Sequence, residues 1–296
     1  MLSKFIENPW RIFNVIAAKG LLNWMPDKAY LKLRYRASLG KKLDLNNPRT
    51  FNEKMQWLKL YDHRPEYAKM VDKYEVKKYV ADIIGEEYII PTLGIWDSFD
   101  EIDFEGLPSQ FVLKCTHDSG GLVICKDKDS LDIEAARKKI EKSMRVNYFK
   151  WGREWPYKQI KPRIIAEQYM DSGDASGIMD YKVHNFNGIP KIVVVCSERF
   201  SDSGLKEDFF DDKWRHLDLC RPSHSNSDYN IEKPESFDKM LELSRILANK
   251  IPFVRTDFYE VEGKLYFGEL TFYPASGMEG FCPDDWDNIL GSWLTI

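Results

Sequence analysis

The spacing of hydrophobic and polar positions changes along the chain and predicts helices first, then strands. Up to about residue 84 the apolar side chains recur at helical spacing, and Thr50-Phe51-Asn52-Glu53 has the pattern of a capping box. Beyond that point, short apolar runs predict strands, and two later segments return to helical spacing. The predicted strands are 88–91, 111–115, 122–125 and 163–170, and the predicted helices are 131–144 and 236–250.

Two hairpins are expected in the second half of the chain. Asn187-Gly188 supplies the two positive-φ residues of a type I′ turn between alternating runs. Residues 201–230 are polar and predict a long loop, and a second hairpin spans about 253–272. Helices separated from short, largely antiparallel strands predict an α+β fold.

The last hairpin carries charged residues whose convergence depends on its register. A three-residue loop ending at Gly263 would place Arg255 opposite Glu269 and put Asp257 on the same face, whereas a two-residue loop would split the set. Two neighbouring carboxylates are suitable ligands for Mg²⁺. The alternative is a solvated face that carries an ordinary ion pair.

Other segments contain groups that suit a nucleotide. The strand 111–115 leads Lys114 into a glycine-containing loop, where backbone N–H groups can approach an anion, although an ordinary turn is the alternative. Lys73 and Lys77 lie one helical turn apart and would both reach a polyphosphate, unless they simply face solvent. Glu167 ends a strand and precedes Asp174 by seven residues, a spacing that allows contacts to adenine and ribose.

The order of these segments resembles the ATP-grasp superfamily. Over about residues 46–280, the sequence resembles the TupA-like ATP-grasp family of bacterial cell-surface polysaccharide biosynthesis. The segments that carry this resemblance are FNEKMQWLKLYD, DKYEVKKYV, FVLKCTHDSGG and DFYEVEGKLYFGELTFYP. The resemblance implies an ATP-grasp fold, in which two α+β subdomains sandwich the nucleotide. It divides the chain into a helical, basic region (1–70), a subdomain with the phosphate loop (71–170) and a subdomain with the metal site (171–296).

The resemblance also implies roles for individual residues. ATP phosphates would be held by Lys73 and Lys114, under a loop that includes Thr116, His117, Ser119, Gly120 and Gly121. Adenine and ribose would be contacted by Glu167, Gln168, Tyr169, Met170 and Asp174. Mg²⁺ would be bound by Asp257, Glu269 and Thr271, although many superfamily members have asparagine at the position of Thr271. The charge that develops on the transferring group would be stabilised by Arg255, Lys182 and Arg199.

The implied reaction activates a carboxylate as an acyl phosphate, which an amine then attacks to give an amide and ADP. The expected substrates are a sugar-acid or polysaccharide precursor, such as a uronic acid, and an amine such as an amino acid, and no nucleic acid is expected as a partner. Three alternatives remain open: a glycosyltransferase that uses the acidic pair, a sugar phosphotransferase, and a non-catalytic nucleotide-binding module.

Composition and charge predict where the protein works. Hydrophobic residues at 43% and charged residues at 30% indicate an ordered globular chain, and no apolar run approaches the roughly 20 residues of a membrane span. Five scattered cysteines and the absence of a secretory pattern predict reduced thiols in the cytoplasm. Residues 1–42 carry a net charge of +7 within an overall −4. Leu2, Phe5, Ile6, Trp10, Phe13 and Ile16 lie among these charges, so this segment either contacts an anionic membrane surface or packs on the main domain.

Overall fold

The N-terminal part of the chain is helical, as the spacing of its apolar residues predicted. The computed structural model describes residues 10–171, 177–199, 201 and 204–296. The first five helices described are α2 (Trp10–Ala18), α3 (Asp27–Leu39), α4 (Phe51–Tyr61), α5 (Tyr67–Val71) and α6 (Glu75–Ile84). Thr50 and Glu53 form the predicted capping box at the start of α4. No helix within the described ranges is both long and apolar enough to cross a membrane.

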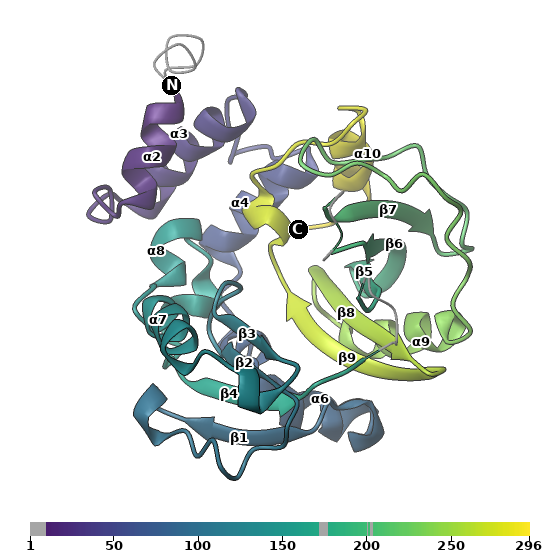
Figure 1. Ribbon diagram of the computed structural model, residues 1–296. Coiled ribbons are helices and arrows are strands. Elements are labelled where there is room, and N and C mark those ends of the chain that lie inside the picture. The colour runs from purple at the N-terminus through teal and green to yellow at the C-terminus, as the bar shows by residue number, and fades with distance from the viewer. Residues whose placement is uncertain (1–9, 172–176, 200, 202–203) are drawn as a thin grey trace.

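Two antiparallel sheets form the rest of the fold (Figure 1). The first has the order β1-β4-β2-β3, with β1 (Thr92–Trp96), β2 (Phe111–Cys115), β3 (Leu122–Cys125) and β4 (Ile164–Gln168). The second has the order β7-β6-β5-β8-β9, with β5 (Asp180–Phe186), β6 (Ile189–Ser197), β7 (Lys206–Asp211), β8 (Phe253–Val261) and β9 (Lys264–Thr271). The remaining helices are α7 (Ile133–Met144), α8 (Tyr148–Gly152), α9 (Phe237–Leu247) and α10 (Trp286–Trp293). The fold is therefore α+β, as predicted.

Each sheet has its own hydrophobic core. The first sheet packs on α7, where Leu113, Ile140 and Ala166 are fully buried. The second sheet packs on α9 and on the N-terminal helices, with Val193 and Phe258 at its centre. A third, smaller cluster holds α2 and α3 together. Because the cores are separate, the space between the two sheets can be lined by polar groups.

Two predictions about local structure are wrong. Residues 88–91 do not form a strand, because Glu86–Tyr88 is a 3₁₀-helix and β1 begins only at Thr92, after Pro91. The polar segment 201–230 is not entirely a loop, because it contains the edge strand β7. The strand was not predicted because its charged residues suggested an exposed loop. One of them, Asp208, is in fact buried and accepts a hydrogen bond from the Ser227 N–H at 3.0 Å. The turn at Asn187-Gly188 has the predicted positive φ values of 50° and 80°.

The register of the last hairpin also corrects the prediction. Its loop has two residues, Glu262 and Gly263, with φ values of 52° and 72°, so Val261 pairs with Lys264. With regular pairing from this loop, Asp257 and Glu269 would not lie opposite each other, but the pairing shifts by one residue at Gly268. This β-bulge places Asp257 directly opposite Glu269. A Cβ at Gly268 would lie 3.0 Å from the Tyr259 ring and 3.2 Å from a backbone oxygen, which explains the glycine.

Candidate active site

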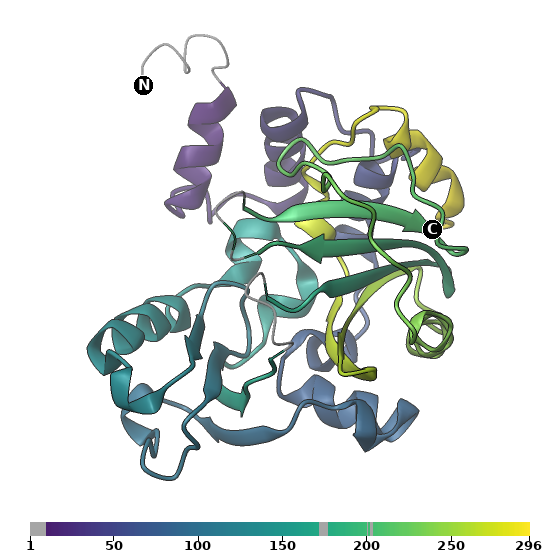
Figure 2. The same ribbon diagram turned by 45° about the vertical axis from the view of Figure 1, so that its right-hand side comes forward.

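A cleft of about 720 Å³ separates the two sheets. One wall comes from β2, β3 and β4, the loop after β2 and Lys73, and the other comes from the five strands of the second sheet. Figure 2 shows the two sheets on opposite sides of this region. The cleft is the place where the separate sequence motifs meet.

A buried carboxylate between two ammonium groups lies in the first wall. Glu167 is 5% exposed, and its two oxygens lie 2.5 Å from Lys77 Nζ and 2.5 Å from Lys114 Nζ. Burial alone would raise the pKa of Glu167, but the attraction of Lys114 and Lys77 outweighs it and lowers this pKa to about 2. Lys77 also donates to the Ile90 carbonyl at 2.6 Å, so its ammonium belongs to this internal pair and not to a phosphate.

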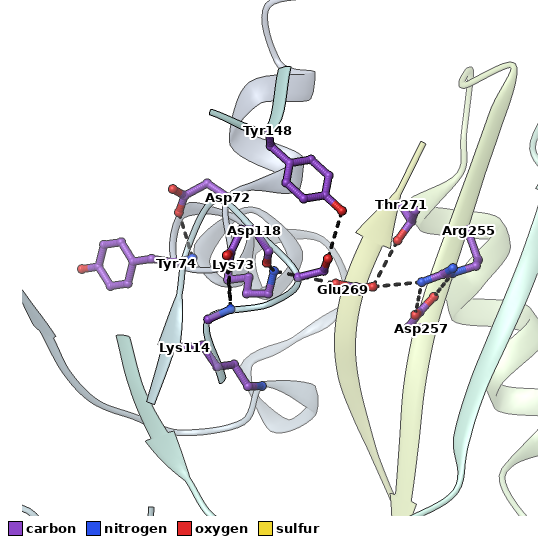
Figure 3. A network of polar contacts seen from close by, with 12 residues as sticks. Asp72, Lys73, Tyr74, Lys114, Asp118, Tyr148, Arg255, Asp257, Glu269 and Thr271 are labelled. Carbon is purple, nitrogen blue, oxygen red and sulfur yellow. Dashed lines mark hydrogen bonds and ion pairs between the residues drawn. The ribbon is translucent and has the colours of Figure 1, made fainter. Parts of the chain in front are cut away.

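The loop after β2 is held by its own hydrogen bonds. The Asp118 carboxylate accepts the Gly121 N–H at 3.1 Å and the Ser143 hydroxyl, and the Asp118 carbonyl accepts a hydrogen bond from Lys73. Lys73 Nζ also lies 4.0 Å from Glu269 Oε2, on the opposite wall (Figure 3). Ser119 contacts the Tyr148 hydroxyl at 2.9 Å. The loop therefore brings one lysine to the point where the two sheets approach each other.

The second wall carries a dense network of charges. Asp257 is 1% exposed and accepts hydrogen bonds from Arg255 Nε and from Lys182 Nζ, each at 2.6 Å. Arg255 also donates to Glu269 at 2.9 Å, and Thr271 donates to the same oxygen at 3.2 Å (Figure 3). Burial opposes charge on Lys182, but its carboxylate neighbours raise its pKa above the ordinary value. The wall therefore places two carboxylates and two cations side by side.

The structure brings most of the predicted site residues to the cleft. The lining includes Lys73, Lys114, Ser119, Gly121, Glu167, Gln168, Tyr169, Met170, Lys182, Arg199, Asp257 and Glu269. Thr116, His117, Gly120, Arg255 and Thr271 are not among its lining residues. His117 is buried, and its Nε2 lies 3.1 Å from the Val146 carbonyl. Asp174 lies outside the described residues.

Some lining residues were not expected. One carboxylate oxygen of Asp180 accepts a hydrogen bond from Arg199 at 3.1 Å and also contacts Lys182. The other carboxylate oxygen of Asp180 is buried and has no hydrogen-bond partner in the described chain. Its position two residues before Lys182 on one strand was the signal for it. Glu207 and Tyr259 also line the cleft. Glu207 could not be found because its strand was predicted as a loop.

Two antiparallel sheets enclose a cleft with lysines on one wall and paired carboxylates on the other, which is the arrangement that the resemblance to the ATP-grasp superfamily implies. The family model described as TupA-like ATPgrasp matches residues 53–295. The chain therefore belongs to the TupA-like ATP-grasp family, which confirms the resemblance seen in its sequence. None of the curated proteins compared with the chain matches it.

Solved structures with a similar fold include three ligases or synthetases. The D-alanine–D-alanine ligase of Helicobacter pylori is 16% identical, with a TM-score of 0.43 over 82% of this chain and 69% of that one. The Bacillus anthracis enzyme complexed with ATP is 13% identical, with a TM-score of 0.41 over 74% of this chain. D-Cycloserine synthetase is 12% identical, with a TM-score of 0.43 over 90% of this chain and 77% of that one. The match to the Bacillus anthracis enzyme spans only 55% of its length.

The residues of the cleft fit a magnesium nucleotide. Asp257 and Glu269 offer carboxylate oxygens side by side, and the buried unpaired oxygen of Asp180 lies in the same wall. Within the described ranges, no group of three or more His, Cys, Asp or Glu side chains gathers in a way that would hold a metal. Mg²⁺ commonly binds proteins through one or two carboxylates and takes its other ligands from phosphates and water. The pair of carboxylates is therefore sufficient for Mg²⁺ bound together with a nucleotide.

Proposed function

We propose that this protein is an ATP- and Mg²⁺-dependent carboxylate–amine ligase of cell-surface polysaccharide biosynthesis, working in the cytoplasm. One observation supports the proposal most. Lys73 and Lys114 on one wall face Asp257 and Glu269 on the other, across a single cleft of about 720 Å³. Membership of the TupA-like ATP-grasp family adds independent support. The substrates we propose are a sugar acid, such as a uronic acid, and an amine, such as an amino acid.

The first wall would hold the triphosphate. Each charge-assisted hydrogen bond from Lys73 or Lys114 to a phosphate contributes roughly 1.5–3 kcal/mol. Glu167 fixes the Lys114 ammonium at 2.5 Å, so little rotamer entropy is lost when the nucleotide binds. Asp118 and Ser143 hold the loop in place, and the Asp118 carbonyl positions Lys73 toward the same anion.

The second wall would hold the metal and the developing charge. Asp257 and Glu269 are the proposed Mg²⁺ ligands, and Mg²⁺ would neutralise the phosphate oxygens. Arg255 bridges these two carboxylates, and Lys182 approaches Asp257 from the neighbouring strand. These cations keep the carboxylates in place before the nucleotide arrives. Lys182, which lines the cleft, would then face the region where charge builds up on the transferring phosphoryl group, and Arg255 would act through the two carboxylates that it holds.

In the proposed reaction, the carboxylate oxygen of the sugar acid attacks the γ-phosphorus and ADP leaves. The amine then attacks the carbonyl carbon of the acyl phosphate, inorganic phosphate departs and takes up the proton that the amine loses, and an amide remains. Neither step requires a covalent intermediate on a side chain. The contribution of the protein is to position the reactants and to stabilise charge, as is usual for phosphoryl transfer.

The test combines purified protein, ATP and Mg²⁺ with a panel of uronic acids and amino acids, followed by ADP measurement and mass spectrometry. We expect ADP release that requires both substrates, together with a new amide. Lys114→Met should abolish this release, and Lys126→Met, which changes another lysine at the cleft, should reduce it less.

Other products would favour the alternatives. A phosphate ester would identify a sugar phosphotransferase, and transfer from a nucleotide-sugar without ADP would identify a glycosyltransferase. ATP binding without turnover on any substrate pair would favour a nucleotide-binding module. Each of these outcomes would refute the ligase proposal.

A further inference from the structure

The N-terminal helix exposes large apolar side chains to solvent. Ile12 is 46% exposed and Val15 is 45% exposed on α2, and the turn after the helix exposes 62% of Leu21 and 78% of Trp24. Trp24 is the most exposed large hydrophobic residue in the described chain. In Figure 1, α2 lies at the outer edge of the molecule beside α3. Exposed apolar groups concentrated in this way mark interaction surfaces.

Packing of α2 does not require these side chains. The inner face of α2 already contacts α3. On that face of α2, Ala17 is buried, and the Phe13 ring lies 5.9 Å from the ring of Tyr30 on α3. Leu22 and Met25 extend the same contact from the turn. Ile12 and Val15 therefore lie on the outward side of α2, and Leu21 and Trp24 stay exposed in the turn that follows it.

Exposed positive charges lie on the neighbouring helix α3 and at the end of α2. Lys28, Lys32 and Arg36 are exposed at intervals of four along α3, so they form one stripe, and the Arg36 guanidinium lies 5.1 Å from the Trp10 ring on α2. Lys19 adds a further exposed cation at the end of α2.

Two acidic residues lie near this stripe and do not cancel its charge. Asp27 pairs with the buried Arg153 at 3.3 Å, so its charge is already compensated. Asp44 accepts the backbone N–H groups of Asn46 and Asn47 at 2.9 and 3.2 Å and carries one negative charge, so it offsets one cation at most.

We propose that this N-terminal patch, made of Ile12, Val15, Leu21, Trp24, Lys19, Lys28 and Lys32, binds the surface of an anionic membrane. An apolar side with a tryptophan, flanked by lysines, is the combination that favours the interface between lipid headgroups and acyl chains. The excess of positive charge favours an anionic lipid surface over a neutral protein partner. The contact would be peripheral, with the cleft left open to its substrates.

The test uses the full chain and two kinds of lipid vesicle. One contains phosphatidylcholine alone, and the other contains about one third phosphatidylglycerol. We expect co-sedimentation with the anionic vesicles only, and a loss of binding at high salt because counterions screen the lysines. The double variant Leu21→Ser/Trp24→Ser should bind at least tenfold more weakly.

The charge variant has a matched control. Each Lys near an anionic surface contributes about 1 kcal/mol, so Lys28→Glu/Lys32→Glu should weaken binding by at least about thirtyfold. Lys138→Glu/Lys142→Glu changes two exposed lysines with the same spacing on α7 and should leave binding unchanged. All variants should keep the thermal midpoint of the parent, because the changed side chains are exposed.

Three outcomes would overturn the proposal. These are equal binding to both kinds of vesicle, an equal loss of binding in the α7 control, and no binding to the anionic vesicles at all. A dimer seen by light scattering that dissociates in the Leu21→Ser/Trp24→Ser variant would instead assign the patch to a contact between two copies of the chain.

Discussion

The substitution Glu167→Gln tests whether the buried carboxylate organises the first wall of the cleft. The change keeps the shape of the side chain but leaves the ammonium groups of Lys77 and Lys114 without their counterion. Breaking a buried ion pair by removing one partner costs about 3–5 kcal/mol. The lowering of the Glu167 pKa from 4.5 to about 2 gives a similar value, about 3 kcal/mol. For a chain of this size, such a loss lowers the thermal midpoint by roughly 5–8 °C.

Urea unfolding at several pH values is the direct assay. A depressed carboxyl pKa stabilises the fold fully above the unfolded value of 4.5, and this stability disappears as the pH falls through about 2. The difference between the parent and Glu167→Gln should therefore be complete at pH 7 and fall to about half or less by pH 3. Lys77→Met added to Glu167→Gln should recover part of the loss, because it removes one unpaired cation.

A surface pair provides the control for this experiment. Lys78 and Asp82 form an i,i+4 pair whose side chains are 83% and 62% exposed. Asp82→Asn should change the free energy of unfolding by less than about 0.5 kcal/mol. A Glu167→Gln variant within 1 kcal/mol of the parent at pH 7 would refute the reasoning, because the pair would then contribute no more than an exposed one.

Three further predictions concern the second wall and the cysteines. Asp257→Asn should reduce ADP release at least about 100-fold, as expected for a metal ligand, whereas Glu260→Gln on the same strand should not, since that carboxylate binds Ser236 instead; equal rates would exclude Asp257 from the reaction. Gly268→Val should cost about 1–3 kcal/mol in urea unfolding because its Cβ would crowd a ring and a carbonyl, and an unchanged midpoint would mean that the bulge tolerates a side chain. The backbones of Cys220 and Cys282 pair in a β-bridge, so oxidation with cystine should join the two side chains in a disulfide. A thiol titration should then find two fewer than the five free thiols, and the Cys282→Ser variant should not form this disulfide.

Local patterns were enough to predict much of the fold. The strands 111–115 and 122–125 have the predicted bounds because each is a short apolar run between turn residues. Asn187-Gly188 specified its hairpin because few residues adopt two consecutive positive φ values. The capping box at Thr50 was equally readable, since both of its hydrogen bonds are local.

Features that depend on pairing between distant segments were not predictable in the same way. The partner of Lys77 is Glu167, ninety residues away, and no local pattern joins them. β7 was missed because its charged residues are satisfied by a later segment, as the Asp208 contact to Ser227 illustrates. The convergence of Asp257 and Glu269 was predicted from a loop of the wrong length, and the bulge restored it. The roles of the individual site residues remain predictions.

The bulge at Gly268 has a consequence for how this hairpin can change in evolution. Side chains alternate between the two faces of a strand, so gaining or losing one residue in the turn would move Glu269 away from its partner. A second irregularity within the same strand can reverse that displacement. Length changes in this hairpin should therefore appear in compensating pairs, one at the tip and one near Gly268, among sequences that keep both acidic residues. A homologue with a turn longer by one residue and an uninterrupted ladder would preserve the same chemistry by the opposite route.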